Sequence, residues 1–416
     1  MNYTLSQNAW QGFESVDIEL PDNWDVEYYG IPGDNEPVLT KEKLKEKINS
    51  PYGSKTIYEL ARNANEVCVV FDDISRGTPV RPMAEIVLEE LKGAGVKDEN
   101  IRFICALGTH GAHNRADFVN KLGKDICDHY PIYNHNCYEN NVFIGKNSKG
   151  HDVCCNQEMM SCDLRIGIGA ITPHPFNGFG GGAKIIFPGM ASIDTIANNH
   201  KTAVDDIRER KINAVANMGD IKIDKMRKEN EEMGRMVGQF FKIDCLYNTK
   251  LEIVDLYAGD IVEEYYAAIP AAQKLYAMPR FDDKDIVITN ANAKANEAQI
   301  AITVASLAVN KKGGDIVIVN RTKMGQCTHY LFGEFGKNAG GRMHGRLPRV
   351  RPWVNRYIFW MEPDLGSRHW YGDIDKQFFV DSWQEVIDLL KETHGDGTKV
   401  AIIADGTISC YELENE

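Results

Sequence analysis

Several features that would narrow the function of this 416-residue chain at once are missing from it. No segment approaches the roughly 20 consecutive apolar residues that a membrane-spanning helix needs. The N-terminal sequence MNYTLSQNAWQGFESVDIEL has no basic start followed by an apolar core, so a secretory signal is not indicated. The ten cysteines include no CxxC pair and no zinc-site spacing, so we expect reduced core thiols. These absences predict a cytoplasmic protein with no membrane partner.

Positive charge is also scarce. The chain has 47 Lys and Arg against 60 Asp and Glu, a net charge of -13. General nucleic-acid binding is therefore disfavoured, because its affinity depends on cations that neutralise phosphates. One local cluster is basic despite the acidic chain. It could bind an anionic ligand or form a solvated basic loop, and it consists of Arg342, Arg346, Arg349, Arg351 and Arg356.

Short apolar runs recur along the chain, and each is followed by a turn and a helical pattern. This alternation predicts an α/β fold with mainly parallel sheets flanked by helices. The expected strands cover residues 67–71, 101–107, 164–171, 286–289, 316–319 and 400–404. The length favours two domains, and the interruption MPRFDDK at 278–284 divides residues 1–278 from residues 285–416. The stretch 321–375 is expected to form long loops around a site.

Reactive side chains follow three of the expected strands. Asp73 and Arg76 come after the first strand, His110 after the second and His174 after the third. Ligands of open α/β sheets bind beyond the carboxyl ends of strands. An imidazole can gain or lose a proton near neutral pH. Two such bases facing one substrate would allow proton transfer on either face, as a racemase or epimerase requires.

A glycine-rich loop, Gly178 to Gly182, lies between His174 and Lys184, and His200 closes an expected short helix that begins at Ser192. The loop lacks the GxxxxGK[ST] pattern of a P-loop and the strand-to-helix setting of a GxGxxG motif. Backbone N–H groups of such a loop attract phosphate. The layout suits a phosphate-bearing cofactor or a metal, with His200 as a metal ligand or a helix-end cation.

The motifs DDISRGTP, ALGTH, PHPFNGFGGGAKIIFPGMAS and NNH resemble those of the nickel-dependent lactate racemase family. The resemblance covers most of residues 60–200 and, more loosely, the two-domain layout. It implies an active site in the cleft between the domains, where residues 1–278 anchor the cofactor and residues 285–416 close the substrate site. The implied cofactor is a nickel pincer nucleotide, made with the help of other proteins of the cell.

The resemblance also assigns roles to residues. Lys184 would tether the nucleotide, His200 would bind nickel, and His110 and His174 would be the paired acid and base. Further cofactor contacts are implied for Asp73, Ser75, Arg76, Gly180, Gly181 and Gly182.

The chain departs from the family at one place. Lactate-active members carry a YQxxK pattern that grips the substrate, whereas this chain reads NANAKANEAQIAITVAS, with Ala298 and Ala301 near those positions. The loss of such a contact, worth about 2 to 5 kcal/mol, predicts a substrate larger or more polar than lactate, such as a sugar acid or a hydroxy-dicarboxylate. Candidate substrate contacts are Arg76, Lys294, Gln299, His329 and Arg349, with Lys323 and Arg351 as further possible cations.

The expected function is racemisation or epimerisation at C2 of a 2-hydroxy acid, by hydride transfer to and from the tethered cofactor. Two alternatives stay open. One is a related dehydrogenase that releases the 2-keto acid, and the other is a non-catalytic protein that binds the nucleotide or nickel.

Overall fold

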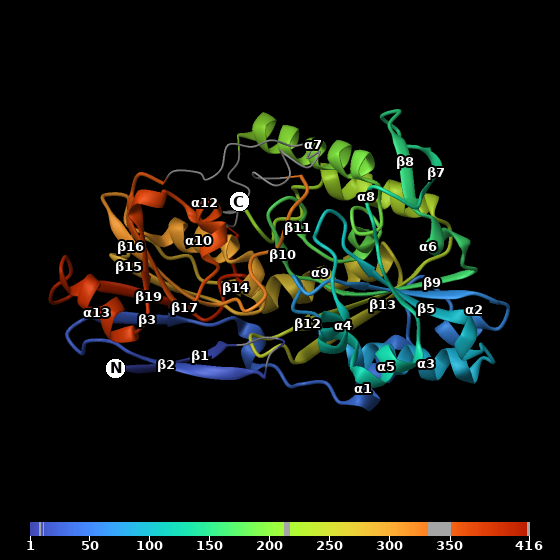
Figure 1. Cartoon of the computed structure of the whole chain (residues 1–416), viewed down its shortest axis with the longest axis horizontal. Helices are drawn as coiled ribbons and strands as arrows, with labels where there is room; N and C mark the ends of the chain where they lie inside the picture. The colour runs from blue at the N-terminus through green and yellow to red at the C-terminus, as the bar shows by residue number, and fades with distance from the viewer. Residues whose placement is uncertain (8–9, 11, 212–216, 332–350, 414–416) are drawn as a thin grey trace.

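The computed structural model describes residues 1–7, 10, 12–211, 217–331 and 351–413. Two six-stranded sheets dominate it, and helices flank both (Figure 1). The predicted α/β fold with mainly parallel sheets is confirmed. Among the described residues, no helix is long and apolar enough to cross a bilayer.

The first sheet has the strand order β13-β12-β9-β4-β5-β6. Its strands pair in parallel except for β12 and β13, which are antiparallel. All six residues of β4 are buried, as expected for a strand covered on both faces. The bounds are Val67–Asp72 (β4), Ile101–Ala106 (β5), Ile132–Asn134 (β6), Leu164–Ala170 (β9), Phe241–Tyr247 (β12) and Ile253–Asp260 (β13).

The second sheet has the order β18-β17-β16-β15-β19-β3, and its pairs are parallel throughout. The bounds are Asp25–Tyr29 (β3), Ile286–Ala291 (β15), Gly314–Arg321 (β16), Val354–Glu362 (β17), Gln377–Val380 (β18) and Lys399–Ile403 (β19).

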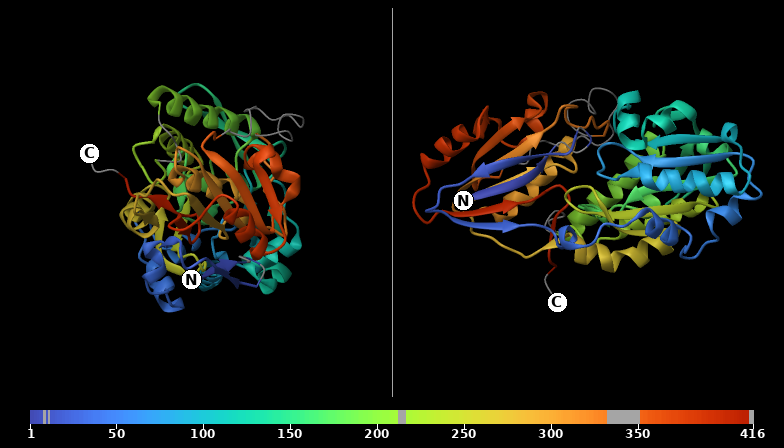
Figure 2. Two further views of the ribbon diagram at one scale, coloured as in Figure 1. Left: turned by 90° about the vertical axis from the view of Figure 1, so that its left-hand side faces the viewer. Right: turned by 90° about the horizontal axis from the view of Figure 1, so that it is seen from below.

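The N-terminal segment lies with the second sheet. Strand β3 pairs with β19, and the hairpin of β1 (Asn2–Gln7) and β2 (Glu14–Glu19) packs Leu5 and Ile18 into the same apolar cluster as Ile286 (Figure 2). The division at 278–284 stays a prediction, but these first strands belong spatially with the C-terminal part of the chain.

Helices cover the sheets and carry part of the site. The longer ones are α3 (Val80–Gly93), α7 (Ile193–Arg210), α8 (Lys225–Met236), α9 (Glu263–Tyr276), α10 (Gln299–Ala308) and α13 (Trp383–Lys391). The shorter ones are α1 (Lys41–Ile48), α2 (Ile57–Ala61), α4 (Arg115–Leu122), α5 (Lys124–His129), α6 (Gln157–Ser161) and α12 (Arg368–Tyr371). Short strand pairs complete the fold: β7 (Asn141–Lys146) with β8 (Asp152–Asn156), β10 (Pro173–His174) with β11 (Gly178–Phe179), and β14 (Ala277–Met278) with β20 (Cys410–Tyr411).

Two local expectations were wrong. Helix α7 starts where predicted, because the Ser192 side chain caps it by accepting from the Thr195 amide, but it continues to Arg210. His200 therefore lies in mid-helix, which excludes the helix-end role. The stretch 321–375 also contains the buried strand β17, whose apolar run YIFWM the weak periodicity had obscured.

Candidate active site

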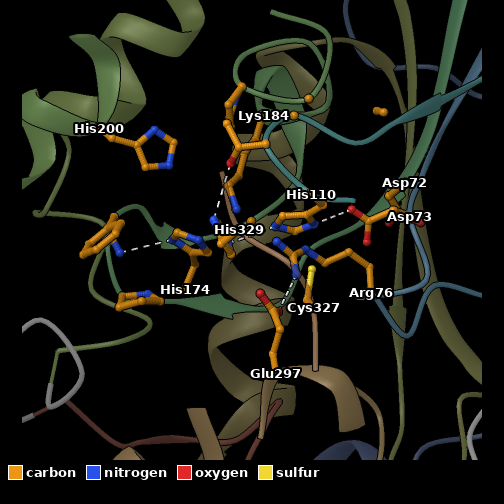
Figure 3. Close-up of a pocket in the computed structure, with 18 of the residues that line it drawn as sticks. Asp72, Asp73, Arg76, His110, His174, Lys184, His200, Glu297, Cys327 and His329 are labelled. Carbon is orange, nitrogen blue, oxygen red and sulfur yellow. Dashed lines mark hydrogen bonds and ion pairs between the residues drawn. The ribbon is translucent and has the colours of Figure 1, made fainter. Parts of the chain in front are cut away.

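A cavity of about 1230 Å³ lies where the ends of the two sheets face each other. Ligand sites in proteins usually measure about 300 to 1,000 Å³, so this one has room for a cofactor and a substrate together. The first sheet and its loops contribute Asp72, Asp73, Arg76, His110, His174, Gly180, Gly181, Lys184 and His200 to the lining, and the second contributes Lys294, Asn296, Glu297, Gln299, Gln326, Cys327 and His329 (Figure 3). The cavity thus brings together most of the residues that the sequence singled out.

His110 follows β5 and is held by a carboxylate. Its Nδ1 lies 2.6 Å from Oδ2 of Asp73, which follows the neighbouring strand β4. Burial opposes a charge on His110, but Cys327 and Asp73 favour it, so the pKa of His110 is well above its usual value. Burial likewise raises the pKa of Asp73, but His110 and Arg76 reverse this and hold it well below the ordinary range. The pair is therefore an imidazolium and a carboxylate.

The surroundings of His174 have the opposite effect on its pKa. Burial, followed by the charges of Lys184, Arg76 and Lys294, lowers its pKa well below the usual value. The Phe176 amide donates to His174 Nδ1 over 3.1 Å. The ring is therefore neutral, and its hydrogen lies on Nε2.

Lys184 follows the glycine-rich loop in a short 3-10 turn and points into the cavity (Figure 3). It forms no ion pair with any residue in the described part of the chain. Burial first, and then Arg76 and Lys294, lower the pKa of its ammonium group well below the usual value. A lysine that loses its proton easily is a nucleophile, so Lys184 suits covalent attachment of a group.

His200 faces the cavity from α7, one turn beyond the residue that fixes its ring. Its Nδ1 donates to the Ile196 carbonyl over 3.0 Å, so in the neutral ring Nε2 carries the lone pair. Burial lowers the pKa of His200 to about 4. A neutral imidazole with a fixed tautomer is the form that binds a transition metal.

The glycine-rich loop does not offer the amide groups that the sequence suggested. The Gly180 amide donates to the Thr172 carbonyl over 2.8 Å, and the Gly182 amide donates to Asp244 Oδ2 over 2.6 Å. Gly182 also lies outside the cavity lining, unlike Gly180 and Gly181. Gly181 has φ +83°, and a Cβ there would come within 2.5 Å of Ile171. Tight packing and a positive φ require glycine at 181 and 182, and the amides of Gly180 and Gly182 are already used within the protein.

Ser75 is not part of the cavity lining either. Its hydroxyl lies 3.3 Å from His110 Nδ1 and accepts from Arg76 Nη1 over 2.9 Å. Ser75 can therefore orient these two side chains without touching a ligand.

The second sheet contributes a polar wall. Lys294 is buried and donates to Thr172 Oγ1 over 3.1 Å, and burial lowers its pKa to about 8, with a further contribution from Arg76. Glu297 pairs with Arg76 at 2.5 Å. His329 Nε2 lies 3.1 Å from His110 Nε2.

Other sequence-predicted contacts fall elsewhere. Ala298 and Ala301 are fully buried in the apolar core, so they do not form a wall of the cavity. Arg351 is buried and donates to Thr303 Oγ1, and Lys323 is exposed away from the cavity. Arg349 lies outside the described residues.

The sequence missed two groups at the cavity. The sequence predicts that Cys327 is a core thiol, yet Cys327 lines the cavity beside His110. Lys242 and Asp244 form an ion pair of 2.5 Å whose side chains are both fully buried. The sequence signal for this pair is that Lys242 and Asp244 stand two residues apart within the otherwise apolar strand β12. A charged side chain in a buried strand needs a partner of opposite charge.

Comparison with known proteins agrees with this geometry. Residues 11–211 match the family model for the lactate racemase N-terminal domain. This stretch, just under half of the chain, is similar to the N-terminal domain of lactate racemases. The matched part contains His110, His174, Lys184 and His200 of the first wall.

Two curated members of the family align with the chain. The lactate racemase of Lactiplantibacillus plantarum is 28% identical over 284 residues, which are 67% of this chain and 65% of the relative. The lactate racemase of Thermoanaerobacterium thermosaccharolyticum is 25% identical over 281 residues, which are 66% of this chain and 64% of the relative. The alignments thus span slightly less than two thirds of both relatives.

The fold extends further than these alignments. The lactate racemase apoprotein of T. thermosaccharolyticum superposes with a TM-score of 0.73 at 20% identity, covering 98% of this chain and 99% of the other. A protein from Thermotoga maritima gives a TM-score of 0.66 at 19% identity, covering 91% and 100%. Both sheets therefore belong to a fold that this chain shares with these two solved structures.

Proposed function

We propose that the protein racemises or epimerises a 2-hydroxy acid at C2, with a nickel pincer nucleotide tethered to Lys184. The observation that carries the proposal is that two histidines at one cavity lie in opposite surroundings, His110 against a carboxylate and His174 among cations. His110 is held as an imidazolium by Asp73, and His174 is kept neutral by burial and nearby cations. Titratable groups whose pKa values are driven apart are a mark of acid and base roles.

The residues present fit the proposed cofactor. Lys184 supplies a readily deprotonated amine, and His200 presents an imidazole with a fixed tautomer to the same cavity. The cations around Lys184 suit the phosphate of a nucleotide. The chemistry that this group supplies when bound is reversible uptake of the C2 hydrogen as hydride, which the protein's own side chains cannot perform. Proteins that synthesise the cofactor would be partners in the cell.

The chain's own residues would bind the substrate and move the hydroxyl proton. Arg76 and Lys294 can bind the substrate carboxylate, since both are cations within the cavity. His174 accepts the hydroxyl proton of one configuration, and the contact of its Nδ1 with the Phe176 amide must be released for this. His110 donates a proton from Nε2 to the oxygen on the other side, while Asp73 holds its Nδ1.

The polar second wall supports a substrate with more hydroxyl groups than lactate. Asn296, Glu297, Gln299 and Gln326 line the cavity, and their side chains can donate to or accept from hydroxyl groups. The Glu297 carboxylate would repel a second carboxylate. A polyhydroxylated acid therefore fits better than a dicarboxylate.

The test is to purify the protein from a cofactor-producing host and measure its intact mass and nickel content. We expect a covalent adduct of one nucleotide with one nickel in the wild type, no adduct in Lys184→Arg, and an adduct without turnover in His174→Gln. The loaded wild type should interconvert the C2 epimers of at least one sugar acid. Accumulation of keto acid would indicate the dehydrogenase, and an adduct without interconversion of any hydroxy acid would indicate a binding protein. Either result would contradict the proposal.

A further inference from the structure

Four side chains from separate parts of the sequence gather on one side of the cavity. His110 follows β5, Glu297 precedes α10, and Cys327 and His329 follow β16 (Figure 3). Ligand atoms of His110, Glu297 and His329 all lie within 4.8 Å of one another. We propose that these three residues form a second metal site, for Zn²⁺, separate from the site of His200. The binding itself does not depend on the proposed function.

The spacing of the two imidazoles matches a shared ion. Their Nε2 atoms are 3.1 Å apart, with the rings inclined at 71°. Two nitrogen ligands at about 2.0 to 2.1 Å from a tetrahedral Zn²⁺ lie about 3.3 Å apart. The spacing of the two nitrogen atoms therefore needs little change, whereas the rings have to turn from the hydrogen bond between them toward a common ion and the Glu297 carboxylate has to approach further.

The backbone fixes this spacing. His110 and His329 form an antiparallel bridge, and the Tyr330 amide donates to the Thr109 carbonyl over 2.9 Å. The two histidines therefore face each other because the loops that carry them are paired, and a metal would not have to assemble them.

Each ligand also has an outer partner, as the ligands of metal sites in proteins usually do. Asp73 Oδ2 is 2.6 Å from His110 Nδ1, and Thr109 Oγ1 is 3.4 Å from His329 Nδ1. Arg76 holds one oxygen of Glu297 at 2.5 Å. Zn²⁺ would displace the Nε2 proton of the His110 imidazolium into solvent, and the Asp73 contact would keep the remaining hydrogen on Nδ1, so that Nε2 can bind the cation.

The donor set selects the metal. Two imidazoles and one carboxylate suit Zn²⁺, whereas Mg²⁺ and Ca²⁺ prefer oxygen ligands. Cys327 lies beside His110 but outside the group of ligand atoms within 4.8 Å of one another, so its thiol would have to move toward the ion to become the fourth ligand. On the basis of the proposed function, Zn²⁺ here would inhibit the enzyme, because it occupies the nitrogen with which His110 transfers a proton.

The test begins with the full-length protein, prepared without cofactor and freed of metal by a chelator. Zn²⁺ binding is measured by calorimetry, and Co²⁺ serves as a spectroscopic probe of tetrahedral coordination. We expect one high-affinity equivalent, weakened more than about 100-fold in His329→Ala and weakened in Glu297→Gln, which keeps the side-chain shape. Cys327→Ser should remove the thiolate-to-cobalt absorption.

Two variants serve as controls, and circular dichroism confirms that each variant is folded. His200→Ala should retain the site, and His129→Ala removes an exposed histidine paired with Asp98 and should change nothing. Binding that survives in His329→Ala, or is lost in His200→Ala, would overturn the proposal. In the loaded enzyme, activity insensitive to saturating Zn²⁺ would also overturn it. A loaded enzyme without any activity would contradict the proposed function and leave the measured binding intact.

Discussion

The two walls of the cavity are built differently. On the wall from the first sheet, side chains are fixed mainly by neighbours on the same wall: His110 by Asp73, His174 by Phe176 and His200 by Ile196. On the wall from the second sheet, the polar contacts reach across the cavity, from Glu297 to Arg76, from His329 to His110 and from Lys294 to Thr172.

This difference suits the first wall to proton transfer and the second wall to substrate recognition. The first wall is held in place without its counterpart, as suits groups that transfer protons, except that His174 must release the Phe176 amide before its Nδ1 can accept one. The contacts of the second wall connect the two halves, and a ligand that enters the cavity must replace some of them. We infer that the first wall sets the chemistry and that the second sets the substrate.

The largest effect is expected on the first wall. His110→Gln and His174→Gln should each lower kcat by about 10²- to 10⁴-fold, the usual contribution of a general acid or base. KM should change little, because neither residue is the main contact of the substrate carboxylate. Steady-state kinetics of the loaded variants checks this. If either variant raised KM and kept kcat, the proposed separation of the walls would be wrong.

The next effect is expected on the second wall. Lys294→Met should raise KM and lower kcat/KM by about 10- to 100-fold, because a hydrogen bond to a charged group is worth about 1.5 to 3 kcal/mol. The pKa of Lys294 is about 8 without ligand. In the wild type, KM should therefore rise above pH 8 as the ammonium loses its proton, and this rise should be absent from Lys294→Met. The matched control is Lys323→Met, at an exposed lysine outside the cavity, which should leave KM unchanged at every pH.

The same difference explains what the sequence could predict. Asp73, Arg76 and His110 follow buried strands, so a parallel sheet brings them together. His174, Lys184 and His200 lie close together in the sequence, so local pattern predicted the fold class and the grouping of these residues. The contact between His110 and His329 depends on how two sheets face each other, which no local pattern encodes. Periodicity could not show that Ala298 lies in the core or that β3 joins the second sheet.

A smaller effect concerns the support behind the first wall. His135 is buried, donates from Nε2 to the Ala191 carbonyl and accepts from Asn156 at Nδ1. Burial lowers its pKa to about 4, whereas the unfolded chain has a value of about 6.5. The stability from this neutral ring is present above pH 6.5 and is lost as the pH falls toward 4, because the unfolded state binds the proton more tightly.

This loss should amount to about 2 kcal/mol between pH 7 and pH 5. Urea unfolding at the two pH values measures it. His135→Gln should reduce the pH dependence by that amount, and His129→Gln, at an exposed position, should keep the wild-type dependence. If the free energy of unfolding depended on pH equally in the wild type and both variants, the neutral His135 ring would not contribute to the stability of the fold behind the first wall.

The smallest effect on catalysis is expected at Ala301, behind the second wall. If Ala301 faced the substrate, Ala301→Val would exclude large acids, and KM would rise more for larger substrates than for smaller ones. The structure instead buries Ala301 against Gly406, where a Cβ on Gly406 would lie 3.0 Å from the Ala301 Cβ. The added methyl groups should therefore cost about 1 to 3 kcal/mol of folding free energy and leave KM unchanged for small and large acids alike. A KM that increased with substrate length would place Ala301 at the cavity. Substrate size would then be controlled by this helix and not, as we propose, by polar lining residues such as Glu297 and Gln299.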